Sequence, residues 1–330
     1  MKTTLVFGGA GFVGLNIAER LLAEGEAVVL FDRSPLPDAA TAAFAALPGS
    51  LEVVRGDVTD VGDITHAMTY QVDTVVLGAA VTADAAREAR DPETILQINL
   101  AALTPLLRAA RDADVRRVIN LSSAAAYGHA AMDVATVAED TPPQPIGLYG
   151  ITKFASEMIG GRLAALWSLD FVNLRLSGVF GPWERATGVR DTTSPQFQIT
   201  EAARHGTPAL LQRPGVRDWV YAPDVARAVH AIAQAPSLQH RIYNVSAAER
   251  WSALAWGEQL AALRPGFVCR LARAGESPTI DLHAPTDRAP LSVARLQAEL
   301  GWQASFGMAA SAWHLDAWCR RHDPSIKGIS

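Results

Sequence analysis

Short apolar runs alternate with stretches of helical periodicity along the first half of the chain. Such alternation is typical of a parallel sheet whose two faces are covered by helices. The pattern predicts strands near residues 3–7, 27–31, 51–55, 73–78, 116–121 and 170–176. It predicts helices near residues 12–24, 39–47, 61–70, 92–111 and 149–168. Asp91-Pro92-Glu93 marks the start of one helix, and Pro105 is expected to kink it.

The alternation weakens after about residue 177, where prolines and glycines divide the chain into short pieces. Later helices are predicted over 251–263, 292–300 and 308–320. We therefore expect an α/β fold, a doubly wound parallel Rossmann sheet over residues 1–177, to which the chain returns around 216–245. Residues 178–330 should mainly form a second, smaller substrate-binding lobe that closes over the carboxyl ends of the strands.

Composition narrows the classes of function. The chain has 330 residues, 49% of them hydrophobic, which is enough for a large core, and a net charge of -5. Because its basic residues are scattered and no apolar run reaches membrane-spanning length, neither nucleic acid nor a membrane is expected as a partner. Cys269 and Cys319 have no disulfide or metal-ligand spacing, and the first strand begins without a leader segment. These features predict a cytoplasmic protein without a metal site.

A glycine motif follows the first predicted strand. Residues 8–14 read GGAGFVG and run directly into a predicted helix, which places free backbone N–H groups and a helix N-terminus where a pyrophosphate can bind. Asp32 ends the next strand, at the distance expected for a carboxylate that binds the ribose hydroxyls. This arrangement predicts a dinucleotide site built on Gly8, Gly11, Phe12, Val13 and Gly14. Asp32 favours NAD and makes NADP less suitable, although Arg33 beside it could pair with the extra phosphate.

A second motif, Tyr149-Gly150-Ile151-Thr152-Lys153, lies at the start of a predicted helix. Residues four apart share a helix face, so the Lys153 ammonium is expected to lie beside the Tyr149 phenol and to lower its pKa. A phenol with a lowered pKa can act as a general base near neutral pH.

Together these residues resemble the extended short-chain dehydrogenase/reductases of the NAD-dependent epimerase/dehydratase family. The resemblance covers nearly the whole chain. It rests on motifs in a fixed order: GGAGFVG, Gly56-Asp57-Val58, Gly78-Ala79-Ala80, SSAAAYG at 122–128, YGITK at 149–153, Val179-Phe180-Gly181-Pro182, Arg217-Asp218-Trp219-Val220 and Glu299-Leu300-Gly301-Trp302.

The resemblance implies a function for individual residues. Tyr149 would exchange the proton of a substrate hydroxyl, Ser123 would bind the same oxygen, and Lys153 would hold the cofactor ribose. Asn99 stands where the family has an asparagine that supports the active-site water and lysine. The cofactor would further contact Asp57, Val58, Ala79, Ala80 and Ser122. Tyr127 and the eight histidines are interpreted as structural or surface residues. The family resemblance also implies a homodimer formed through helices that include 149–168.

Two departures from the family pattern limit the chemistry. Ala124 and Ala125 stand where dehydratases of the family carry an acid–base Asp-Glu pair, so dehydration is not expected. Gly178 replaces an asparagine common in enzymes that act on nucleotide sugars, which removes one expected contact. An anionic substrate remains compatible with four arginines, Arg185, Arg190, Arg217 and Arg288, while Trp183 could cover a sugar ring.

The function of these arginines has alternatives. Arg185 and Arg190 could instead pair with Glu184 and Asp191 in a solvated loop, and Arg217 and Arg288 could hold either a pyrophosphate or a carboxylate. The leading hypothesis is an NAD-dependent oxidoreductase acting on a hydroxyl-bearing carbon of a small anionic sugar-type molecule, similar to a sugar-acid dehydrogenase. The alternatives are a nucleotide-sugar epimerase with tightly held NAD, and a catalytically silent dinucleotide-binding sensor.

Overall fold

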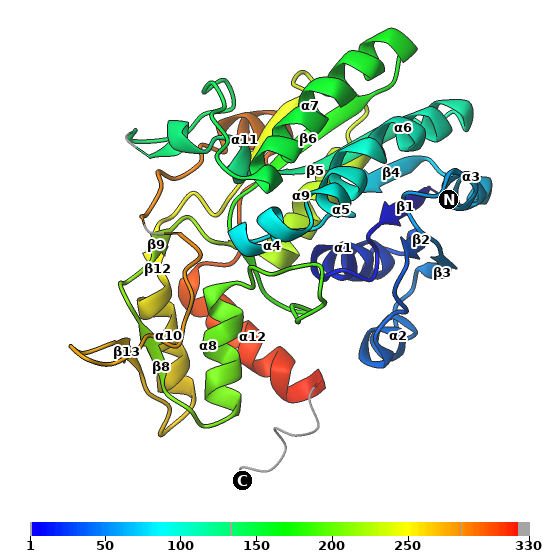
Figure 1. Ribbon diagram of the computed structural model, residues 1–330. Coiled ribbons are helices and arrows are strands. Elements are labelled where there is room, and N and C mark those ends of the chain that lie inside the picture. The colour runs from blue at the N-terminus through cyan, green and yellow to red at the C-terminus, as the bar shows by residue number, and fades with distance from the viewer. Residues whose placement is uncertain (1, 133, 285, 323–330) are drawn as a thin grey trace.

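The computed structural model describes residues 2–132, 134–284 and 286–322. Among these residues a seven-stranded sheet has the order β11-β6-β5-β4-β1-β2-β3, and all its strand pairs are parallel (Figure 1). The strands are β1 (Thr3–Phe7), β2 (Ala27–Asp32), β3 (Ser50–Arg55), β4 (Thr74–Leu77), β5 (Arg117–Ser123), β6 (Phe171–Leu176) and β11 (Ile242–Val245). The six strands predicted in the first half are confirmed, and β11 joins the sheet beside β6.

Helices cover both faces of the sheet because successive strand residues point to opposite sides. Val6 packs with α1 and α9, whereas Leu5 and Phe7 pack with α6 and α7. One face carries α1 (Phe12–Ala23), α2 (Asp38–Phe44), α9 (Ala222–Gln234) and α11 (Ala294–Leu300). The other carries α3 (Val61–Ala67), α6 (Leu103–Asp112) and α7 (Leu148–Trp167). The predicted doubly wound, Rossmann-like sheet is therefore confirmed.

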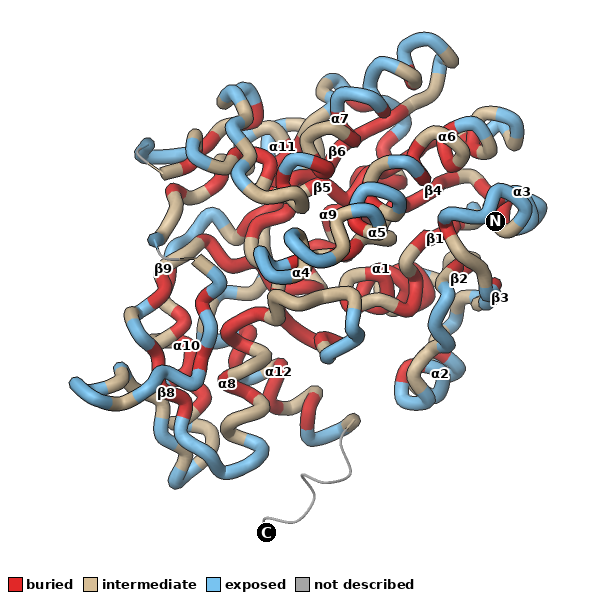
Figure 2. The backbone as a smooth tube through the Cα atoms, viewed as in Figure 1, coloured by how far each residue is buried: buried red, intermediate tan, exposed pale blue. Residues whose placement is uncertain are grey.

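A separate hydrophobic cluster includes Trp251 and Trp256. It is built from α8 (Pro195–Arg204), β8 (Ala209–Leu211), β12 (Trp251–Ser252), α10 (Ala253–Leu263), β13 (Cys269–Leu271) and α12 (Met308–His322). The helices that carry it, labelled α8, α10 and α12, lie to one side of the sheet (Figure 2). Short pairs connect this region to the sheet through β7 (Val179–Phe180), β9 (Val216–Arg217) and β10 (Val220–Tyr221). The predicted boundary between the lobes at residue 178 stays a prediction.

The long helix predicted over 92–111 is interrupted about one turn before Pro105, where the kink was expected. It forms α5 (Pro92–Leu96), a π-helical turn (Gln97–Ala101) and α6. The Ala102 N–H bonds to the carbonyl of Gln97, five residues back. A proline ring clashes with the carbonyl four residues before it, so Pro105 affects Ala101 rather than its own position. The irregular turn carries Asn99 into the interior.

Sequence reasoning missed the short helix α4 (Ala85–Arg90) and α8, both of which begin with a capping side chain. Asp84 accepts from the Arg87 N–H at 2.7 Å, and Ser194 accepts from the Phe197 N–H at 3.0 Å. Both caps are readable in the sequence as Asp or Ser before a helical segment. None of the described helices combines the length and apolar character that crossing a membrane requires.

A buried ion pair fixes α7 against the sheet. The Arg175 guanidinium on β6 contacts the Glu157 carboxylate on α7 at 2.5 Å, and both side chains are 2% exposed. Ser122 on β5 donates to the same carboxylate at 2.5 Å. The Glu157 carboxylate thereby connects β6 with β5 and α7, and the latter two carry candidate site residues.

We expect Glu157→Gln to lower the free energy of unfolding by about 3–5 kcal/mol, because it leaves the Arg175 charge buried without its partner. Replacing both residues with apolar ones, Glu157→Leu with Arg175→Met, should recover most of that loss. Urea unfolding of the three proteins measures both effects. A single variant as stable as the wild type would contradict the interpretation.

Candidate active site

A cleft of about 280 Å³ opens at the carboxyl ends of β1, β4, β5 and β6. A second hollow of about 110 Å³ lies beside the ends of β2 and β3. The two share Gly8, Gly11, Gly78, Ala80 and Val189 in their walls, so they form one continuous site. Every candidate site residue lines one of these hollows except Asn99 and Arg288.

The glycine loop between β1 and α1 is closely packed against its surroundings. Gly8 has φ +78°, in the left-handed region, and a Cβ at Gly14 would lie 2.4 Å from the Gly8 carbonyl oxygen. The N–H groups of Gly8 and Gly9 both donate to the Phe31 carbonyl. The loop therefore brings bare backbone to the start of α1, where a phosphate could approach closely.

Asp32 connects the end of β2 to this loop. Its Oδ2 accepts from the Ala10 N–H at 3.1 Å, and its Oδ1 accepts from the Ser34 N–H at 2.9 Å. Arg33, Asp57, Val58, Ala79 and Ala80 line the same hollow. A backbone hydrogen bond from Thr59 lowers the pKa of the Asp57 carboxyl. Negative charge thus lies on one side of the hollow, with the Arg33 side chain in the same wall.

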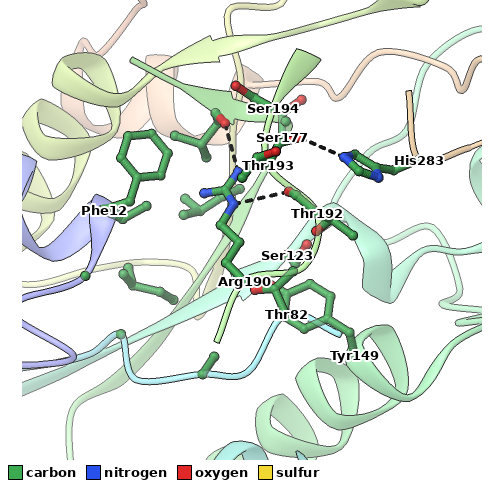
Figure 3. Close-up of a pocket in the computed structure, with 18 of the residues that line it drawn as sticks. Phe12, Thr82, Ser123, Tyr149, Ser177, Arg190, Thr192, Thr193, Ser194 and His283 are labelled. Atoms are coloured by element: carbon green, nitrogen blue, oxygen red, sulfur yellow. Dashed lines mark hydrogen bonds between the residues drawn. The ribbon is translucent and has the colours of Figure 1, made fainter. Parts of the chain in front are cut away.

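Tyr149, Lys153 and Ser123 all line the larger cleft. Figure 3 shows Ser123 next to Tyr149. Glu88 of α4 accepts from the Tyr149 N–H at 3.4 Å, which places a carboxylate at the N-terminus of α7. The Lys153 amine lies 5.8 Å from the centre of the Tyr149 ring and donates to the Leu121 carbonyl at 2.7 Å. Ser123 hydrogen-bonds to the Tyr149 phenol. The predicted triad is therefore adjacent in space.

The expected lowering of the Tyr149 pKa is wrong, and Lys153 is not among the groups that shift this pKa. Burial raises the pKa of the Tyr149 phenol, and the groups that oppose this are Ser123, Arg190 and Thr82. Burial lowers the pKa of Lys153 itself to about 8, partly countered by Glu157. Helical spacing correctly predicted that the two residues share a face, but it could not show that the amine bonds to the end of β5.

Asn99 stabilises the wall of the site through hydrogen bonds to Val81 and Thr152. Its Oδ1 accepts from the Val81 N–H at 2.7 Å, and its Nδ2 donates to the Val81 carbonyl at 3.0 Å and to Thr152 at 3.3 Å. Asn99 thus fixes the segment after β4 to α7 without lining the cleft.

Two further side chains near the triad are engaged in structural contacts. Ser122 lines the cleft but donates its hydroxyl to Glu157. The Tyr127 hydroxyl donates to Asn244 at 2.8 Å, and its fully buried ring lies under the Arg175 guanidinium. These contacts agree with the structural interpretation of Tyr127.

The two arginines expected to bind an anion differ in their surroundings. Arg288 does not line the cleft, because its guanidinium contacts Asp218 at 2.9 Å and Ser177 at 2.6 Å and is 10% exposed. Arg217 does line it, half-buried over the Trp219 ring at 4.9 Å. Its guanidinium has no ion pair with any described residue, and burial together with nearby Arg288 lowers the pKa of Arg217 to about 10. Of these two arginines, Arg217 is the one available to an anion in the cleft.

The segment after β7 also differs from expectation. Trp183 is 5% exposed, donates to Glu19 and packs on Trp318, so it cannot cover a sugar in the cleft. Arg185 donates to the Ala10 carbonyl at 2.5 Å, on the glycine loop. Arg190 pairs with Glu184 at 3.1 Å, which is one of the pairings in the alternative interpretation, but Glu184 is buried, so the loop is not solvated there, and Arg190 still lines the cleft.

Steric crowding explains why position 178 is a glycine. A Cβ there would lie 2.6 Å from the Trp219 indole. Trp219 is 4% exposed and lines the cleft beside Arg217. The side chain that the family often has at this position is thus excluded by the bulk of Trp219, a relation that a single sequence does not reveal.

Sequence reasoning missed a group of hydroxyl residues and one histidine in the cleft wall. His283, interpreted as structural or surface, contacts the Thr193 carbonyl at 2.7 Å and lies at the cleft (Figure 3). The hydroxyl residues missed are Thr82, Ser177, Thr187, Thr192, Thr193 and Ser194. Ser194-Pro195 was visible as a helix start, but the approach of Thr82 and His283 depends on tertiary packing.

The buried Lys153 should give the stability a specific pH dependence. Its pKa is about 8 when folded and 10.5 when unfolded, so the unfolded chain binds more protons between these values and stability rises with pH there. Lys153→Met should therefore stabilise the protein more at pH 7 than at pH 10.5, by a difference of about 2–3 kcal/mol. Urea unfolding of both proteins at the two pH values tests this. Equal differences at both would contradict it.

Comparison with known proteins places this geometry in a family. The profile of the NAD dependent epimerase/dehydratase family matches residues 4–246. The UDP-glucose 4-epimerase of Mycolicibacterium smegmatis is 29% identical over 68% of this chain and 71% of its own length.

Two solved structures are similar over nearly the whole chain. MoeE5 in complex with UDP-glucuronic acid and NAD is 28% identical, with a TM-score of 0.74 over 97% of this chain and 99% of its own. The UDP-glucose 4-epimerase of Thermus thermophilus in complex with NAD is 27% identical, with a TM-score of 0.74 over 95% and 99%.

The residues present also fit a dinucleotide. A Cβ at Gly8 or Gly14 would clash with neighbouring backbone, so the loop that lines both hollows is confined to bare glycine backbone there, and Asp32 ends β2 beside it. These residues would hold the pyrophosphate and a ribose, while Lys153 and Tyr149 stand at the opposite end of the continuous site. From this cradle, the Tyr149–Ser123–Lys153 group and the family match, we conclude that the chain is an NAD-dependent enzyme of the epimerase/dehydratase family, of the extended short-chain dehydrogenase/reductase type.

Proposed function

We propose that this enzyme acts on a nucleotide-linked, anionic sugar and inverts one hydroxyl-bearing carbon through a transient ketone. The observation that carries the proposal is the cleft itself. Tyr149 and Ser123 line it together with Arg217, a half-buried cation that has no ion pair among the described residues. Such a cation requires an anionic partner to offset its loss of hydration. The UDP-sugars in the names of similar proteins carry an anion of this kind.

The proposed chemistry uses the residues at the catalytic end of the cleft. The Tyr149 oxygen, in its phenolate form, takes the hydroxyl proton while a hydride leaves the same carbon and the C–O bond becomes a carbonyl. Bound NAD supplies the acceptor, and later the donor, of that hydride. Ser123 holds the substrate oxygen by hydrogen bonding, and the hydroxyl residues of the cleft wall suit a polyhydroxylated ring. Reversal with the hydride added to the other face of the ketone gives the epimer.

The absence of an acid–base pair after Ser123 argues against elimination of water. Ala124 and Ala125 occupy those positions and form a short 3₁₀ turn with Ala126. A methyl group can neither accept nor donate a proton. The proposed reaction therefore ends at the ketone or returns from it.

A second candidate is net oxidation of a free sugar acid. One observation favours it: Arg288 is engaged by Asp218, which leaves one arginine at the substrate end of the cleft. A single guanidinium is sufficient for a carboxylate, whereas two would grip a pyrophosphate more firmly. This candidate requires a cofactor that exchanges after each turnover.

We also propose a homodimer formed through α7. Its exposed apolar residues, Ile151, Met158, Ile159 and Leu166, would be covered by a second copy. The boundary near residue 178 and a cytoplasmic location, which the free thiols of Cys269 and Cys319 would suit, remain proposals as well.

Product analysis distinguishes the candidates. Purified protein with NAD is incubated with UDP-glucose, UDP-glucuronic acid or free glucuronate, while the absorbance of reduced cofactor is followed. Conversion of a UDP-sugar to its epimer without net reduced cofactor supports the first candidate, and reduced cofactor that accumulates with glucuronate supports the second. Tyr149→Phe serves as the inactive control, with an expected loss of about 10²–10⁴-fold. If none of the three compounds changes, the proposal is wrong.

The Arg217 interpretation gives a separate prediction. Arg217→Gln should raise the KM for the true substrate by about tenfold or more, because a charge-assisted contact is lost, and should leave NAD affinity nearly unchanged. Steady-state kinetics and NAD titration measure the two effects. Arg288→Gln is the matched comparison, since it should mainly lower the free energy of unfolding. A neutral sugar as best substrate, unaffected by Arg217→Gln, would exclude the anion site.

Cofactor preference follows from Asp32. Its carboxylate should bind the ribose hydroxyls of NAD and repel the extra phosphate of NADP, so NAD should bind more tightly. Asp32→Asn should reduce the ratio of the two affinities by weakening NAD binding and easing NADP binding. Fluorescence titration with both reduced cofactors measures the ratio. Tighter binding of NADPH by the wild type would overturn the assignment.

A further inference from the structure

Residues 182–185, here called the bridge, follow β7 and dock on α1, the helix that begins after the glycine loop. Asn16 of α1 is 3% exposed and donates from its side-chain amide to the Pro182 carbonyl at 2.7 Å. Glu19 of the same helix accepts from the Trp183 indole at 2.7 Å. Because residues three apart share a helix face, one face of α1 holds the bridge at two successive points.

The backbone of Trp183 shows that packing imposes this path. Its φ is +65°, in the left-handed region that residues other than glycine rarely adopt. The indole packs against Phe44 of α2 at 5.8 Å and against Trp318 of α12 at 4.8 Å, measured between ring centres. These contacts offset the unfavourable backbone conformation. The bridge therefore has one defined path from β7 to the glycine loop.

The bridge ends in Arg185, whose guanidinium reaches the glycine loop. Its Nη2 donates to the Ala10 carbonyl at 2.5 Å, and its Nη1 donates to the Trp183 carbonyl at 3.4 Å. The N–H of Ala10 bonds to Asp32, so residue 10 is hydrogen-bonded to a carboxylate and to a guanidinium. Arg185 is half-buried and lines the cleft together with the first turn of α1.

Arg185 has no ion pair within the part of the chain that the structure describes. Its two acceptors there are neutral carbonyl oxygens, whereas Arg190 of the same loop is paired with Glu184. Burial lowers the pKa of Arg185, and the nearby Asp32 carboxylate opposes this effect. A guanidinium carries five N–H donors, so most of those of Arg185 have no acceptor among the described residues. An anion in the cleft would offset the loss of hydration of this charge.

We propose that Arg185 is a cofactor-binding residue outside the glycine motif: its guanidinium, placed at the glycine loop by the bridge, pairs with a phosphate of the bound dinucleotide. The inference goes beyond the proposed function, because it concerns how the cofactor is held and not which substrate reacts. It also reassigns an arginine that the sequence had suggested for an anionic substrate.

The position of Arg185 favours a cofactor phosphate over a substrate anion. The glycine loop and the first turn of α1 offer a pyrophosphate backbone N–H groups, which carry only partial charges. A guanidinium in hydrogen-bond contact with the same loop adds a full charge and a planar fork that matches phosphate oxygens. Arg217, which stacks on Trp219, has no hydrogen bond to this loop among the described residues. The two arginines thus divide cofactor and substrate between them.

The test measures nucleotide binding and needs no substrate. Protein freed of nucleotide is titrated with NAD and with ADP-ribose by calorimetry, and with adenosine by ligand-observed NMR. Arg185→Gln should weaken the binding of NAD and ADP-ribose by about tenfold, because a charge-assisted contact is lost. Adenosine has no phosphate, so its affinity should not change. Arg185→Lys, which keeps the charge without the planar fork, should restore part of the affinity.

A kinetic measurement and a matched variant complete the design. Release of NADH, followed by stopped-flow fluorescence with excess NAD as the chase, should be about tenfold faster in Arg185→Gln, with association nearly unchanged. Arg270→Gln removes the same charge, from an arginine paired with Glu276 outside both hollows. Its affinities and its rate of NADH release should equal those of the wild type.

Three results would overturn the proposal. The first is an unchanged affinity for NAD and ADP-ribose in Arg185→Gln. The second is an equal loss of adenosine affinity, which would mean that Arg185 acts through the shape of the glycine loop and not through a phosphate. The third is a raised KM for a substrate with NAD binding unchanged, which would make Arg185 a substrate contact. Because the titrations involve no turnover, failure of the substrate screen and failure of this proposal are distinguishable.

Discussion

The arrangement of the substrate side depends on one buried carboxylate, that of Asp218. It is fully buried and accepts hydrogen bonds from Ser177 and Ser246, which follow β6 and β11, and from the Leu291 N–H. It also pairs with Arg288. A buried charge is tolerated only when it is paired and hydrogen-bonded, so Asp218 draws these segments together. It engages Arg288 in an ion pair, whereas Arg217 in the cleft has no ion pair with any residue that the structure describes.

At the other end of the cleft the chemistry depends on burial. Removing a phenol from water disfavours its charged form, and removing an ammonium from water disfavours its charged form as well. Tyr149 and Lys153 are shifted in opposite directions by this same effect, the phenol upward and the amine to about 8. The neighbouring groups then determine the size of each pKa shift. The acid–base character of the site is therefore a property of its enclosure and not of the Tyr-x-x-x-Lys spacing alone.

The sequence was sufficient where a local pattern has a single physical solution. The strands around GGAGFVG, the helix that carries Tyr149 and Lys153, and the carboxylate of Asp32 at a strand end follow from periodicity and turn chemistry. The sequence was insufficient where the partner of a side chain lies far away along the chain. Arg288 and Trp183 looked like ligands because their partners, Asp218 and Glu19, lie 70 or more positions away in the chain. His283 was overlooked for the same reason. Pro105 shows a second limit, since its effect on the helix falls on the preceding turn.

The position of Val189 has a consequence for access to the site. Val189 lines both the hollow beside Asp32 and the cleft that holds Tyr149. A displacement of this backbone large enough to uncover the first hollow would therefore also change the wall of the cleft. Release of a dinucleotide and entry of water beside Tyr149 would then be coupled through one residue.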